Sequence, residues 1–171
     1  MKMKNIREGN KSDPLTIQAY SRLVSLPIGP ENVFYFQQGL PAFEEFKKYV
    51  FAFNPEYRPF VFMNSIETAG LSFVCIDPFL IYPDYAPRLS LADKQLLGAT
   101  EPEDVQLLSI VTVRPVMSET TANLQGPIAI NIKNSLCKQI LCEGQSYPIR
   151  CRVLDALEQS CPNTNEKEAL C

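Results

Sequence analysis

Three amide side chains, those of Asn123, Gln125 and Asn131, flank one short apolar run of the chain. Each amide offers hydrogen-bond donors and an acceptor at once, so it can satisfy a turn or pair with the backbone of another protein. Gly126-Pro127 lies between them and marks a turn before the run begins. Two readings stay open here: the amides satisfy buried turn groups, or they belong to a surface that binds a partner.

A second peptide, residues 39–44, combines turn residues with a phenyl ring and a carboxylate. Its last two residues, Phe43 and Glu44, are candidates for contact with a partner. Phe46 follows three positions after Phe43, a spacing that places two side chains on one face of a helix. We therefore expect a short helical turn over residues 42–48.

The chain contains no histidine, so it lacks the commonest general base and a common metal ligand. Nucleophile systems that pair serine or cysteine with histidine are therefore excluded. Asp77 and Asp84 flank an apolar loop, but each adjoins a proline, which is ordinary turn chemistry. The sequence holds no glycine-rich phosphate-binding motif. We expect a protein that is not an enzyme and needs no cofactor.

Six cysteines occur, and only Cys137 and Cys142 have a spacing near that of a zinc site. Structural zinc draws on two such pairs, usually with tighter spacing. On a strand, these two side chains would also point to opposite faces. We expect no metal site, and we expect Cys75 and Cys142 to be buried, reduced thiols. The tail residues Cys161 and Cys171 are expected to be exposed.

The net charge of −3 argues against a nucleic-acid binder, which normally carries a basic face. It suits a basic protein partner, because complementary potentials assist encounter. Residues 1–11 are polar and lack the apolar stretch of a secretory signal. No apolar run approaches the roughly 18 residues that a membrane span needs. We therefore expect a cytoplasmic protein that contacts neither nucleic acid nor membrane directly.

Prolines and glycines separate many short apolar runs, a pattern typical of strands joined by turns. A single helix is expected near residues 90–98, with Ser90 as N-cap, Asp93 in the first turn and Gly98 as C-cap. A hairpin is expected to join two of the strands through residues 67–70. The expected strands are 15–26, 32–36, 49–53, 59–65, 71–77, 105–113, 122–124, 127–133 and 136–142.

These elements predict a mainly β, small single-domain, antiparallel β-barrel-like fold with that one short helix. The domain is expected to span residues 14–150. A flexible extension is expected at 1–13, and a C-terminal tail that is mobile at its end at 151–171. Most aromatic residues fall between Phe34 and Phe62, where they predict one wall of the core. The alternative reading is that some of them face outward as an interface, and Tyr35 and Tyr57 are the first candidates for that.

Several peptides, taken in one order, resemble the FliW family of bacterial flagellar assembly factors. Residues 36–44 are similar to its Gly-Leu-Pro-Gly-Phe-Glu element, but Ala42 stands where the family has glycine. A left-handed backbone at Ala42 would carry a strain penalty. Residues 59–65 resemble a Pro-Phe strand that ends in Leu-Gln-Ser, and here Asn64 replaces the glutamine.

The remaining similarity lies in the second half of the chain. Residues 123–131 resemble the family signature Asn-Leu-x-x-Pro-Ile-x-x-Asn, and Gln139 with residues 147–150 resembles its closing segment. The elements 71–78 and 83–85 stand in the expected places between the two halves. The resemblance covers residues 15–150.

The resemblance implies a cytoplasmic, barrel-like protein, monomeric when free, that binds the translational repressor CsrA and also binds flagellin. In that circuit flagellin occupies the protein, CsrA is released, and flagellin synthesis falls. The resemblance assigns Phe43, Glu44, Asn64, Asn123, Gln125 and Asn131 to protein binding. The alternative, from another class, is a small-barrel protein that binds single-stranded nucleic acid through its aromatic side chains.

Overall fold

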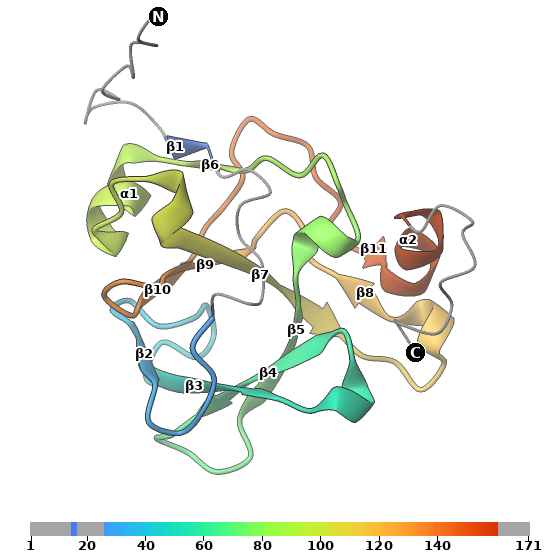
Figure 1. Cartoon of the computed structure of the whole chain (residues 1–171), viewed down its shortest axis with the longest axis horizontal. Coiled ribbons are helices and arrows are strands. Elements are labelled where there is room, and N and C mark those ends of the chain that lie inside the picture. Colours follow the sequence, from blue (N-terminus) through green and yellow to red (C-terminus); the bar gives the residue numbers. More distant parts are fainter. Residues whose placement is uncertain (1–14, 17–25, 161–171) are drawn as a thin grey trace, which may run out of the picture.

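The computed structural model describes residues 15–16 and 26–160 (Figure 1). The predicted extension at 1–13, most of the predicted strand 15–26, and Cys161 and Cys171 lie outside these residues. Short strands dominate the order of elements along the chain. The strands are β1 (Leu15–Thr16), β2 (Val33–Phe36), β3 (Lys48–Phe53), β4 (Phe60–Ser65), β5 (Ser72–Ile76), β6 (Arg88–Leu89), β7 (Val105–Thr112), β8 (Thr121–Ala122), β9 (Ile128–Asn131), β10 (Leu136–Gln139) and β11 (Cys151–Arg152).

Seven of these strands close into a barrel. Their hydrogen-bonded order is β7-β5-β4-β3-β2-β10-β9, and β9 pairs back with β7. The predicted mainly β barrel is therefore confirmed. Within the ring, β2 and β10 run parallel, whereas the other pairs are antiparallel. The parallel pair joins segments that are far apart in the sequence, where no hairpin imposes an antiparallel direction.

The strand directions define two ends of the barrel. At the motif end β2, β4, β7 and β10 finish, and the connections 37–47, 66–71, 113–127 and 140–150 gather there. At the helix end the same strands begin, and the connections are 54–59, 77–104 and 132–135. In Figure 1, β7 runs from the side of α1 (Leu91–Leu97) toward β8 and α2 (Val153–Ser160).

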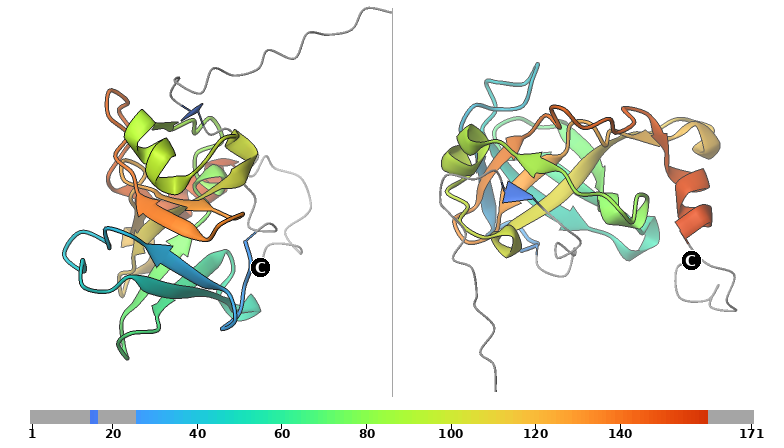
Figure 2. Two further views of the ribbon diagram at one scale, coloured as in Figure 1. Left: turned by 90° about the vertical axis from the view of Figure 1, so that its left-hand side faces the viewer. Right: turned by 90° about the horizontal axis from the view of Figure 1, so that it is seen from above.

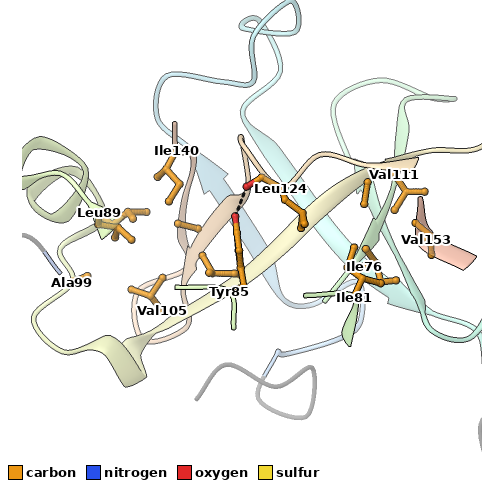
Figure 3. Packing of buried hydrophobic residues seen from close by; sticks show 14 residues of the cluster. Ile76, Ile81, Tyr85, Leu89, Ala99, Val105, Val111, Leu124, Ile140 and Val153 are labelled. Carbon is orange, nitrogen blue, oxygen red and sulfur yellow. Dashed lines mark hydrogen bonds between the residues drawn. The ribbon is translucent and has the colours of Figure 1, made fainter. Parts of the chain in front are cut away.

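The core has two parts. An inner cluster fills the barrel with aromatic and aliphatic side chains, among them Phe34, Phe36, Tyr49 and Phe51. The predicted aromatic wall is thus confirmed, and Tyr35 and Tyr57 are exposed, as expected. An outer cluster packs beneath residues 77–104 and 140–153 (Figure 3). The outer cluster consists of Ile76, Ile81, Tyr85, Leu89, Leu97, Ala99, Val105, Leu107, Val111, Ala122, Leu124, Ala129, Ile140 and Val153.

Tyr85 anchors the outer cluster to the motif end. Its hydroxyl donates to the carbonyl of Leu124 at 2.6 Å, deep in the cluster (Figure 3). Burial raises the pKa of Tyr85 well above its ordinary value, so the phenol stays neutral and remains a donor. The hydrogen bond therefore holds the segment that contains the predicted amides against the long connection 77–104.

The predicted helix is confirmed as α1. Ser90 accepts from the backbone N–H of Asp93 at 3.1 Å, and the Asp93 carboxylate accepts in return from the Ser90 N–H. Gly98 ends the helix in the left-handed conformation, with φ 62°. These signals lie within a few residues of one another, and this locality made the helix readable from sequence.

The predicted helical turn over 42–48 is wrong. Two tight turns stand in its place: Phe43 N–H donates to Leu40 O at 2.8 Å, and Phe46 N–H donates to Phe43 O at 3.0 Å. Ala42 has φ 69°, and a positive φ cannot continue a right-handed helix. The Phe43 and Phe46 spacing therefore arises from successive turns.

The folded chain continues past the boundary predicted at residue 150. β11 pairs with β8, and α2 follows it directly, set beside the barrel in the right-hand view of Figure 2. Val153 is buried, and Leu157 packs against the outer cluster. Residues 151–160 therefore add an apolar edge to the core. Short 3-10 helices occupy Pro55–Tyr57 (η2), Pro78–Leu80 (η3), Pro102–Asp104 (η4) and Met117–Glu119 (η5).

Candidate protein-binding site

The connection 37–47 is held in shape by its own backbone. Gly39 has φ 73°, and a Cβ on it would lie 2.5 Å from the Cα of Glu44, so only glycine fits. The Glu44 carboxylate accepts from the backbone N–H of Ala42 at 2.9 Å. Backbone N–H donors of Glu44 and Ala42 lower the pKa of that carboxyl, which stays ionised. Glu44 is thus exposed but already bonded within the loop.

Phe43 closes the barrel at the motif end. Its ring meets the ring of Phe73 edge to face, with centroids 5.2 Å apart, and it packs against the inner cluster. Pro41, two residues earlier, remains exposed at the rim. The loop therefore presents Pro41 to its surroundings while Phe43 fixes the loop to the core.

Asn123 forms a turn with one of its two amide atoms. Its Oδ1 accepts from the backbone N–H groups of Gln125 and Gly126, each at 3.0 Å. Its backbone N–H donates to Ile110 O at 3.0 Å, at the end of β7. The turn-forming reading is therefore correct for Oδ1, and Nδ2 points elsewhere without a hydrogen-bond partner in residues 26–160.

Gln125 uses both of its amide atoms. Its Nε2 donates to Cys142 O at 2.8 Å, and its Oε1 accepts from the Tyr147 N–H at 2.9 Å. It thereby ties the 123–127 segment to the 140–150 connection. Gln139 makes the neighbouring link, since its Nε2 donates to Gly126 O at 2.8 Å.

These residues form the floor of a groove of about 370 Å³. Leu141 and Ile149, which are 59% and 65% exposed, also line it, together with Pro41 from the connection 37–47. None of the described residues that line it is charged. The complete lining is Pro41, Asn123, Gln125, Gly126, Gln139, Ile140, Leu141 and Ile149. The groove thus brings together the two peptides that the sequence singled out separately.

A second hollow of about 440 Å³ adjoins the groove across Leu141 and Gln139. Its character is different, because Arg88, Asp93, Lys138 and Glu143 line it together with apolar residues. Lys138 pairs with Asp93 and so connects β10 to α1. Charge therefore lies beside the groove and outside it.

Comparisons with known proteins identify the family of the chain. The family model described as FliW protein matches residues 18–153 of the chain.

The chain belongs to the FliW family of flagellar assembly factors.

Its relatives include a flagellar assembly factor FliW of Shouchella clausii, 35% identical over 70% of this chain and 82% of that protein. Another FliW, of Pseudothermotoga lettingae, is 36% identical over 82% and 90% of the two chains. A crystal structure of the flagellar assembly factor FliW superposes with a TM-score of 0.66 at 36% identity, over 75% of this chain and 89% of that one. FliW proteins are assembly factors without enzymatic activity, and this chain is therefore not an enzyme.

Asn64 and Asn131, the two predicted site residues not yet described, lie outside the groove of this FliW protein, as Phe43 and Glu44 do. Asn64 stands on the outer face of β4, in register with Val50 of β3 and Ser72 of β5, one residue before the strand finishes at the motif end. Asn131 is at the helix end and only 1% exposed. Its Nδ2 donates to Leu97 O and its Oδ1 accepts from Lys133 N–H, each at 2.9 Å.

Several groove residues were not chosen from the sequence of this FliW chain. Gln139 was part of the family resemblance but was not selected. Its side-chain hydrogen bond to Gly126, which only the structure reveals, places it in the groove. Ile149 also belonged to the family resemblance, but neither Ile149 nor Leu141 was selected, because single exposed aliphatic residues are common on protein surfaces. Only the fold places them on either side of the amides.

The cysteines of the FliW domain are thiols, and Cys75, Cys137 and Cys142 are buried. This confirms the expectation for Cys75 and Cys142. Burial raises the pKa of Cys75 to about 12 and raises that of Cys142, so both stay protonated. In the part of the chain that the structure describes, no group of three side chains is arranged to hold a metal ion. No helix there is long and apolar enough to cross a bilayer.

Proposed function

We propose that this chain binds a CsrA-type translational repressor and flagellin, and that it works by exchanging one for the other. Membership in the FliW family supports this proposal. The structural observation that carries it is the uncharged groove at the motif end, to which both family peptides contribute. A shaped, uncharged surface without converging ionisable groups is suited to binding a protein.

The exchange runs in the cytoplasm, with the chain monomeric when free. Flagellin that accumulates there occupies the chain, the repressor is released, and flagellin synthesis falls until export removes the flagellin. The net charge of −3 suits a repressor that is basic because it binds RNA. Direct binding of nucleic acid or membrane by the chain is not part of the proposal.

Within this proposal, the six predicted residues have four different roles. Asn123 and Gln125 line the groove and meet the partner. Phe43 and Glu44 fix the connection that places Pro41 at the rim. Asn64 extends the contact over the outer face of β4, whereas Asn131 supports the helix end of the fold.

Isothermal titration of the chain with CsrA and with flagellin from the same organism tests the proposal. We expect both to bind, and we expect Leu141→Ser to weaken at least one of them by about tenfold, since it removes an aliphatic side chain from the contact. The matched control is Val113→Ser, which changes an equally exposed aliphatic residue outside the groove.

Absence of binding to both proteins at tens of micromolar would overturn the proposal. A filter-binding assay with single-stranded RNA examines the alternative class. Tight retention of RNA that weakens steeply with salt would favour a nucleic-acid binder. No retention is expected for an acidic chain whose groove lacks charge.

A further inference from the structure

Two amide groups in the groove have hydrogen-bonding atoms left over. Asn123 Nδ2 and Gln139 Oε1 have no hydrogen-bond partner among the described residues, although the other amide atom of each side chain is bonded. The bonded atoms fix how each amide is oriented, because Asn123 accepts two backbone N–H bonds and Gln139 donates to a carbonyl. The groove therefore offers one free donor and one free acceptor.

Gly126 brings these two side chains together. A Cβ on Gly126 would lie 3.2 Å from Asn123 Nδ2 and 3.2 Å from Gln139 Nε2, so both amides flank the same bare backbone position. The φ of Gly126 is not in the left-handed region, so its backbone does not itself require glycine. A side chain there would crowd both amide nitrogens, so the bare position lets the two amides lie close together.

The surroundings determine what these free groups can meet. Leu141, Ile149, Ile140 and Pro41 supply apolar contact on the sides, and no described lining residue is charged. A charged ligand group placed here would lose hydration without an opposite charge to compensate it. A neutral group that carries both a hydrogen-bond acceptor and a donor, next to an aliphatic side chain, fits this lining.

We infer that the groove binds an extended, uncharged peptide segment, with Asn123 and Gln139 bonding its backbone amide and Leu141 and Ile149 enclosing an aliphatic side chain. A peptide in extended conformation leaves its C=O and N–H groups free, so the C=O accepts from Asn123 Nδ2 and the N–H donates to Gln139 Oε1. A helical segment uses the same groups internally, apart from those in its first and last turns.

This inference rests on the proposed function and deepens it by naming the partner's chemistry. Main-chain hydrogen bonds carry little sequence information, so one groove can accept segments from proteins that are unrelated in sequence. Two partners that both need the same backbone-binding amides would then exclude each other directly.

The test is a nuclear magnetic resonance titration of the ¹⁵N-labelled full chain with a capped alanine peptide that carries one central leucine. Such a short peptide has no stable helix in water. We expect the side-chain NH₂ signals of Asn123 and the backbone signals of Gly126 to shift at millimolar peptide. Peptides with lysine or glutamate in place of the leucine should bind at least fivefold more weakly.

Asn123→Asp is the decisive variant. A carboxylate keeps the acceptor for the Gln125 and Gly126 N–H groups but removes the Nδ2 donor, so peptide binding should weaken about fivefold while the fold stays intact. Gly126→Ala fills the space between the amides and should weaken binding similarly. Val113→Ser, on the connection outside the groove, should leave peptide binding unchanged.

The inference is overturned if the peptide shifts no groove signal, or if it binds Asn123→Asp as well as the parent chain. The same titration with intact CsrA and flagellin separates the two proposals. Binding of either protein that is insensitive to Asn123→Asp and Gly126→Ala would leave the proposed function standing and reject the peptide mode. Backbone chemical shifts typical of a helix in a labelled, bound partner segment would also reject the extended-peptide mode.

Discussion

Asn123 at the motif end and Asn131 at the helix end form the same turn and differ in what else they do. Each Oδ1 accepts from the backbone N–H two residues on, that of Gln125 in one case and of Lys133 in the other. Asn131 donates its NH₂ to Leu97 O and is buried, whereas Asn123 lines a groove and its NH₂ has no partner in the described part of the chain. The second amide atom, more than the turn, separates the two residues, because only that of Asn131 is bonded within the described part of the chain.

The same contrast holds for the carboxylates of the two ends. At the helix end, Asp93 pairs with Lys138 and Asp104 pairs with Lys133 at 2.6 Å, so side chains of opposite charge fix α1 and the 101–104 segment. At the motif end, Glu44 and Glu67 accept from backbone N–H groups of the connection 37–47. The helix end is thus held by pairs of side chains, while the motif end is held by side chains that fix loop backbone.

The largest expected effect is the loss of stability in Asn131→Ala. Removing a buried amide leaves the Lys133 N–H without its acceptor and costs about 2 kcal/mol, which lowers the melting temperature by roughly 4–8 °C. Calorimetry measures this, and titration with flagellin should show unchanged affinity. Asn134→Ala, which removes a second donor to the same Leu97 carbonyl from an exposed residue, should cost less. If fully folded Asn131→Ala bound flagellin much more weakly than the parent chain, the proposed contrast between the helix end and the motif end would be wrong.

Asn123→Ala should show the reverse pattern. Losing two turn hydrogen bonds at a half-buried site costs about 1 kcal/mol, a few degrees of melting temperature, while partner affinity falls about fivefold or more. Comparing Asn123→Ala with Asn123→Asp by calorimetry and titration separates the turn from the free donor. If Asn123→Ala unfolds the chain, Asn123 is structural in the same sense as Asn131.

A smaller gain in stability is expected from Ala42→Gly. Ala42 has φ 69° at the motif end and Ser135 has φ 62° at the helix end, and glycine removes the steric cost of that conformation. The gain is partly offset by the backbone entropy of glycine, which leaves roughly 0.5 kcal/mol for each site. Urea unfolding of Ala42→Gly and Ser135→Gly should show similar increases in midpoint. A decrease at either site would mean that its side chain contributes contacts that outweigh the strain.

The smallest expected effect is on how stability falls with pH when Asp93 is replaced. Burial alone would raise the pKa of Asp93, but hydrogen bonds from Lys138 and Ser90 outweigh it and hold that pKa below its usual value. The stabilisation is therefore complete above the ordinary pKa of an aspartate and is lost as pH falls through the lower folded value. Melting curves between about pH 5 and 2 should fall less steeply for Asp93→Asn than for the parent chain. An identical slope in both would show that the pair adds nothing at the helix end.

The elements with local signals were predictable from sequence, and the closure of the barrel was not. Ser90, Asp93 and Gly98 specify α1 within one short stretch, and the hairpin of β4 and β5 is marked by its turn residues. The parallel pairing of β2 with β10 leaves no such mark, because its register depends on two segments a hundred residues apart. The predicted turn at 42–48 failed for a related reason, since spacing alone does not show that Ala42 is left-handed.

For the site, the sequence identified the amides and missed the apolar sides of the groove. Asn123 and Gln125 stood out because an amide beside Gly-Pro can satisfy a turn or bond the backbone of another protein. The distinction between Asn123 and Asn131 depends on Leu97, a residue far away in the chain, so no local pattern could supply it. Leu141 and Ile149 become significant only through the fold that sets them beside Pro41.

The pairing of β2 with β10 also determines when the protein can first act. Residues 33–36 must wait for residues 136–139 to leave the ribosome before the ring can close, and the groove needs Ile149 as well as Pro41. A polypeptide released before residue 149 therefore lacks the full lining of the groove, and one released before residue 136 also lacks the closed ring. Ring closure and assembly of the groove thus both depend on residues from the second half of the chain.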